Sequence, residues 1–61
     1  MNDYERKQII EALDRENSTQ QRRILETLNS FKNWMMLALS ILYRKLTNEL
    51  TKLWSWLKRL W

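Results

Sequence analysis

Cysteine and histidine are both absent from this 61-residue chain. Their absence excludes disulfides and ordinary zinc sites. A chain this short is marginally stable as a lone monomer and usually needs a disulfide, a metal or a partner. We therefore expect the missing stabilisation to come from self-association, another protein or a lipid surface.

Glycine and proline are absent too. Tight turns with positive φ lose their preferred residue, and no position forces a helix to end. The many Leu, Gln, Glu, Lys and Arg residues favour helix, and little alternation or turn chemistry indicates strands. The sequence predicts an all-α fold.

The usual catalytic groups are also missing. Without histidine and cysteine the chain lacks the common general base and the thiol nucleophile, and without glycine it has no glycine-rich phosphate loop. The acidic residues Glu11, Asp14 and Glu49 stand apart in the sequence and are interpreted as solvated charges. We expect a protein that is not an enzyme and needs no cofactor or metal.

Charge is distributed unevenly in this chain of formal net charge +4. Residues 1–30 hold five basic and six acidic side chains, whereas residues 31–61 hold six basic ones and only Glu49 as an acid, a net charge of +5. All four tryptophans lie in the basic half. This asymmetry indicates an anionic surface as the partner of the C-terminal half.

A regular apolar stripe begins at Ile24. It advances in steps of three and four and repeats every eleven residues, close to the pitch of a straight helix. The stripe comprises Ile24, Leu28, Phe31, Met35, Leu39, Leu42, Leu46, Leu50, Leu53, Leu57 and Trp61. We predict one long amphipathic helix over about 20–61, with further bends left open near 29–30 and 47–48. A shorter N-terminal helix precedes it, either continuous with it or joined by a bend near 17–19.

Four segments follow from these patterns. Residues 1–17 are a polar, mixed-charge helix, 18–33 begin the amphipathic helix, 34–43 are an apolar belt, and 44–61 are a basic, Trp-rich amphipathic helix.

The belt WMMLALSILY carries no charge, and Leu37 and Ile41 lie off the stripe. A helix that is apolar all round must be covered by something apolar. Its length of about 15 Å is half of a bilayer core of ~30 Å, so a full span is disfavoured. Shallow insertion or burial in a helical oligomer is expected instead.

The tail TKLWSWLKRLW places leucines and tryptophans on one arc and basic residues on the rest. This is the pattern of an interfacial helix, with indoles at the headgroup level and cations on anionic lipid. In composition the tail resembles Trp-rich cationic membrane peptides and the membrane-proximal Trp-rich segments of viral fusion proteins.

Candidate site residues fall into two groups. The predicted membrane-binding residues are Trp34, Met35, Met36, Leu39, Leu42, Tyr43, Leu46, Leu50, Leu53, Trp54, Trp56, Leu57, Leu60 and Trp61. The predicted anionic-lipid contacts are Lys32, Arg44, Lys45, Lys52, Lys58 and Arg59.

We interpret the chain as a small membrane-active helical protein that anchors to, remodels or, like a toxin, permeabilises anionic membranes. With no signal peptide it would be made in the cytosol and become peripheral or monotopic. Self-association is expected, and residues 2–17 offer a surface for a protein partner. The alternative is a soluble helical oligomer or scaffold subunit that uses the Leu/Trp stripe as its interface. Nucleic acid is disfavoured because leucines dilute the basic residues.

Overall fold

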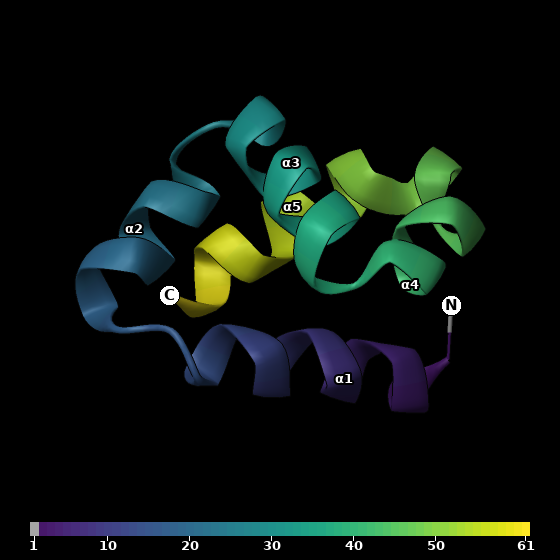
Figure 1. Ribbon diagram of the computed structural model, residues 1–61, viewed down its shortest axis with the longest axis horizontal. Coiled ribbons are helices and arrows are strands. Elements are labelled where there is room, and N and C mark those ends of the chain that lie inside the picture. The colour runs from purple at the N-terminus through teal and green to yellow at the C-terminus, as the bar shows by residue number, and fades with distance from the viewer. Residues whose placement is uncertain (1) are drawn as a thin grey trace.

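The computed structural model describes residues 2–61, which contain helices and no strand, as the sequence predicts. Its elements are α1 (Asp3–Asp14), α2 (Ser18–Glu26), α3 (Leu28–Ala38), α4 (Ser40–Lys45), the short 3₁₀ helix η1 (Thr47–Glu49) and α5 (Leu50–Leu60). In Figure 1, α1 runs along the lower side and the other helices lie over it. The molecule measures 27 × 21 × 21 Å along its principal axes.

Asparagine side chains begin the first two helices. The side chain of Asn2 accepts the Glu5 N–H at 2.9 Å, and the Glu5 carboxylate accepts the Asn2 N–H at 3.3 Å, which completes a capping box. Asn17 caps α2 by accepting the Gln20 N–H at 2.8 Å. The break between α1 and α2 therefore falls at residues 15–17, next to the bend expected near 17–19.

The continuous helix expected over about 20–61 is not present in this structure. The chain leaves helical geometry at Thr27 (φ −131°, ψ 157°), at Leu39 (φ −137°, ψ 59°) and at Leu46 (φ −107°, ψ 21°). A straight helix holds its apolar stripe on one outer side, where the stripe cannot contact itself. The three breaks allow the stripe to fold inward instead.

Most of the stripe forms the hydrophobic core of this one chain. The core also takes Ile9 and Leu13 from α1, and its members are Ile9, Leu13, Ile24, Leu25, Phe31, Met35, Leu42, Leu46, Leu50, Leu53 and Leu57. Full burial of such a side chain contributes about 1.5–3 kcal/mol. The folded chain thus covers most of the stripe by itself, and the expected partners stay a prediction.

Hydrogen bonds join the helices around this core. The Trp54 indole N–H donates to the Leu25 carbonyl oxygen at 2.9 Å, which joins α5 to α2. The Gln21 amide donates to the Leu13 carbonyl oxygen at 2.9 Å, which joins α2 to the end of α1, and the same oxygen also accepts the Glu16 N–H at 3.0 Å. The Trp54 bond thus places α5 next to α2, and the C-terminus of the chain lies beside α2 (Figure 1).

Candidate membrane-binding surface

The predicted membrane-binding residues do not share one surface in this fold. Buried in the core are Met35, Leu42, Leu46, Leu50, Leu53 and Leu57. Half-buried against the core are Trp34, Leu39, Tyr43, Trp54 and Trp56. Exposed are Met36, Leu60 and Trp61. The periodic pattern thus identified apolar side chains that are mainly inside the folded protein.

The two most exposed large apolar residues, with a third exposed one beside them, lie where α3 meets α4. Leu37 and Ile41 expose 83% and 80% of their surfaces, and Met36 exposes 45%. We call Met36, Leu37 and Ile41 the apolar patch. They flank Leu39, whose non-helical geometry separates α3 from α4. Leu37 and Ile41 were not among the predicted site residues, although their off-stripe positions in an uncharged run were the signal for them.

The predicted lipid-contacting cations lie mostly on the surface. Lys32 is half-buried, and the exposed ones are Arg44, Lys45, Lys52, Lys58 and Arg59. Two of the exposed cations also contact other side chains of the same chain. The Lys45 ammonium pairs with Glu5, and the Lys58 ammonium lies 4.6 Å from the centroid of the Trp54 ring. The latter is a cation–π contact.

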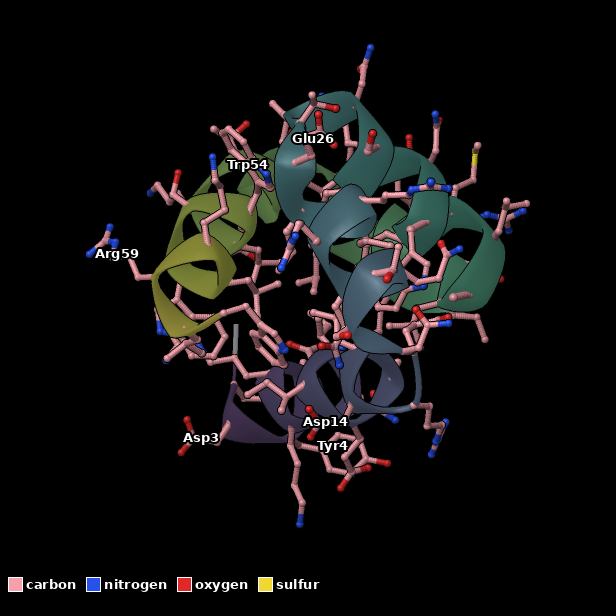
Figure 2. The ribbon with its side chains drawn as sticks, turned by 90° about the vertical axis from the view of Figure 1, so that its left-hand side faces the viewer. Asp3, Tyr4, Asp14, Glu26, Trp54 and Arg59 are labelled. Atoms are coloured by element: carbon pink, nitrogen blue, oxygen red, sulfur yellow. The ribbon has the colours of Figure 1, made fainter. Side chains whose placement is uncertain are left out.

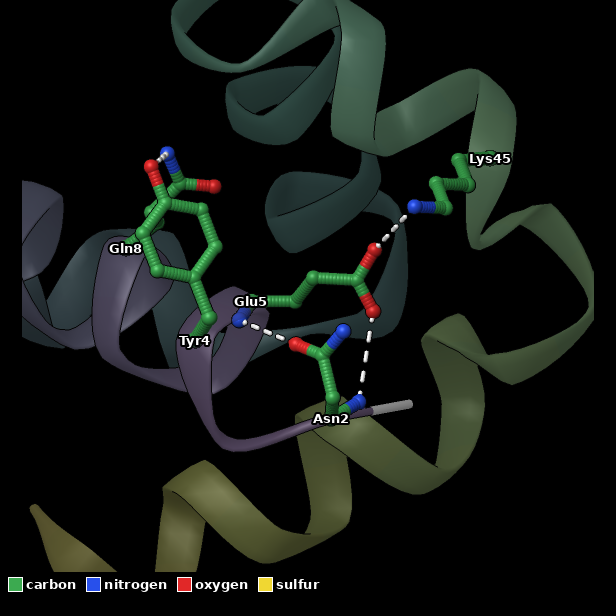
Figure 3. Close-up of polar contacts among 5 residues, drawn as sticks. All are labelled: Asn2, Tyr4, Glu5, Gln8 and Lys45. Atoms are coloured by element: carbon green, nitrogen blue, oxygen red, sulfur yellow. Dashed lines mark hydrogen bonds and ion pairs between the residues drawn. The ribbon is translucent and has the colours of Figure 1, made fainter.

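The Glu5–Lys45 ion pair joins α1 to α4 (Figure 3). Glu5 is only 5% exposed, and its Oε2 lies 2.8 Å from the Lys45 Nζ. The hydrogen bond from Lys45, followed by that from the Asn2 backbone, lowers the pKa of Glu5 below its ordinary value of 4.5. The same bond to Glu5 raises the pKa of Lys45. Next to this pair, the Gln8 amide donates to the Tyr4 hydroxyl at 3.3 Å (Figure 3).

The N-terminal segment contacts several groups predicted to meet lipid. Besides the pairing of Glu5 with Lys45, the Arg6 guanidinium lies 5.3 Å from the centroid of the Trp56 ring. The Trp34 indole N–H also donates to the Glu16 carboxylate at 3.3 Å. Residues 2–17 therefore cover part of the basic, Trp-rich half of the chain.

Two further features bear on the kind of site. Within residues 2–61, no group of three or more acidic side chains is placed to hold a metal ion. None of the helices in that range combines the length and the apolarity that crossing a bilayer requires.

The fold and surface define a small all-α protein with an exposed apolar patch and a basic C-terminal half. No family model, curated protein or solved structure matches the chain. Its function is therefore argued from its own residues.

Proposed function

We propose that the protein binds the surface of anionic membranes and that the apolar patch makes the first contact with lipid. The observation that carries this proposal is the 83% and 80% exposure of Leu37 and Ile41 in a segment without charge. Exposed apolar clusters on small proteins mark interaction sites. Basic side chains, Lys32 and Arg44, stand on either side of the segment in the sequence.

Electrostatic attraction adds to this contact. The net charge of residues 31–61 is +5, and each basic side chain near an anionic lipid surface contributes about 1 kcal/mol. The acidic charge lies mostly in the first half of the chain, so the molecule is polarised along its sequence. An anionic bilayer can attract the basic side chains of residues 31–61 and can also bury the apolar patch, which lies in the same half of the chain.

The long helix over about 20–61 is the conformation we propose for a later, inserted state. The breaks at Thr27, Leu39 and Leu46 contain no glycine or proline and no positive φ, so each residue can also adopt helical geometry. A continuous helix would turn the core leucines outward as one stripe, and lipid would replace the intramolecular core. Release of residues 2–17 would accompany that change.

One alternative function uses the same patch. An uncharged apolar surface is also suited to burial against a second copy of the chain, which would give a soluble helical oligomer. Sedimentation of the protein without lipid distinguishes the two. An oligomer that buries the patch and does not bind vesicles supports the alternative, whereas a monomer that binds vesicles supports the membrane proposal.

Co-sedimentation with vesicles tests the proposal. We expect the protein to pellet with phosphatidylcholine vesicles that contain phosphatidylglycerol and to pellet less with phosphatidylcholine alone. Replacing Leu37 and Ile41 together by serine should weaken binding about tenfold or more for each side chain, because each loses about 1.5–3 kcal/mol of apolar burial. Tyr4→Ser is the matched control, since Tyr4 is 69% exposed but lies on α1. Equal binding by the double variant and the control would contradict the assignment of the patch.

A further inference from the structure

A cleft of about 730 Å³ lies between α2 and the end of α5. Its volume is within the range of small-molecule sites, about 300–1,000 Å³. Arg22 and Leu25 line it from α2, and Lys58 and Trp61 line it from the other side. Figure 2 looks onto this side of the molecule, with α2 and α5 toward the viewer.

Bonds within the protein hold the two walls of the cleft together. Leu25, which lines the cleft, accepts the Trp54 indole N–H through its carbonyl oxygen at 2.9 Å. The Lys58 ammonium lies over the ring of the same tryptophan, 4.6 Å from its centroid. The Trp54 side chain thus contacts both walls of the cleft.

The lining combines cationic and apolar groups. A guanidinium such as that of Arg22 can bind two phosphate oxygens at once, and the Lys58 ammonium adds a point charge from the opposite wall. Leu25 and the Trp61 indole supply apolar surface. Glu26 also lines the cleft and opposes an anion, but the two cations outnumber it.

We propose that this cleft binds the phosphate of an anionic phospholipid headgroup, with Arg22 and Lys58 on the phosphate and Leu25 and Trp61 against the glycerol and the first acyl carbons. Apolar side chains at this end of the chain are exposed, since Leu60 is 55% and Trp61 41% exposed. A lipid can bury these exposed apolar side chains, whereas an inorganic phosphate cannot. The proposal deepens the membrane function and rests on it.

The cleft exists in the folded state that makes the first contact with lipid, before the proposed long helix forms. Opening into one long helix would separate α2 from α5 and remove it. The test therefore uses the full chain with dihexanoyl phosphatidylglycerol below its micelle concentration, a lipid that presents no bilayer. Binding is followed by NMR chemical-shift changes.

Two pairs of variants with equal charge change test the lining. Arg22→Gln is compared with Arg23→Gln, because Arg23 is exposed and adjacent but does not line the cleft. Lys58→Gln is compared with Arg59→Gln, because the Arg59 side chain points into solvent (Figure 2). We expect each cleft variant to bind the soluble lipid about tenfold more weakly than its control, the loss typical of a hydrogen bond between charged groups. Glu26→Gln should strengthen binding.

The outcomes separate this site from the membrane function. Equal losses within both pairs, or binding of inorganic phosphate as tight as that of the lipid, would overturn the headgroup site while vesicle binding by the unaltered protein stands. Cleft-specific losses with the soluble lipid but no binding to vesicles would overturn the membrane function and leave the headgroup site supported.

Discussion

The carboxylate of Glu5 performs two tasks in the fold, because it completes the cap of α1 and pairs with Lys45 of α4. Its folded pKa lies below the ordinary 4.5, so its contribution to stability is present above that pH and is lost as pH falls through the folded pKa. The pKa of Lys45 is raised above 10.5, so its contribution is present below that pH and is lost as pH rises through the folded pKa. The pair stabilises the fold between these limits.

Replacing Glu5 by glutamine should therefore lower stability at neutral pH and have a diminishing effect as the pH falls below 4.5. Urea unfolding of both proteins across this range measures the difference. The control is Glu11→Gln, an exposed carboxylate on the same helix, for which we expect little change. A Glu5→Gln deficit that stays constant into acid would contradict the role of the ion pair.

Two leucines of the C-terminal half differ sharply in burial. Leu53 is 1% exposed in the core, and Leu37 is 83% exposed. We expect Leu53→Ala to cost about 2–5 kcal/mol of the free energy of unfolding and Leu37→Ala to stay within about 0.5 kcal/mol. Denaturant unfolding checks both values. A large cost for Leu37→Ala would mean that something covers Leu37 in solution, as the oligomer alternative requires.

The helices could be predicted from the sequence in kind but not in arrangement. The capping-box spacing of Asn2 and Glu5 and the helical composition can be read from local chemistry, and a bend near residues 17–19 is one of the two connections that the sequence leaves open. The break at Leu39 was not, because leucine favours helix and only packing of the folded chain moves it out of helical geometry.

The candidate site was predictable only in part, for a related reason. Periodicity identifies which side chains are apolar on one helix face, but it does not show whether lipid or the rest of the chain buries them. Leu53, which we predicted to contact lipid, is buried in the core of this structure. Leu37 is not among the predicted residues because it lies off the stripe, and Arg22 is not among them because only the fold brings it beside the C-terminal tail.

A distance measurement tests whether the helices join on the membrane. The chain has no cysteine, so spin labels can be attached to cysteines introduced at Gln20 and Thr51, both exposed and uncharged. In buffer both positions lie in a molecule that measures 27 × 21 × 21 Å along its principal axes, whereas a continuous helix would separate them by about 46 Å. We expect the longer distance on phosphatidylglycerol vesicles. An unchanged short distance in vesicle-bound protein would contradict the long-helix state.

At the scale of the whole molecule, the fold hides most of its apolar stripe and leaves one uncharged apolar patch and a basic half exposed. The N-terminal segment pairs with Lys45, Trp56 and Trp34 and so limits what the basic half presents. In the function that we propose, the chain keeps its core covered until lipid replaces it.

Tryptophan fluorescence of the unaltered protein, titrated with vesicles, tests membrane binding most directly. All four tryptophans lie in the half expected to meet lipid, and three of them are only half-buried. Membrane binding predicts a blue shift of the emission with phosphatidylglycerol vesicles, a smaller one with phosphatidylcholine alone, and weaker binding at high salt, which screens the charges. Emission that stays unchanged while the protein remains in solution beside anionic vesicles would contradict it.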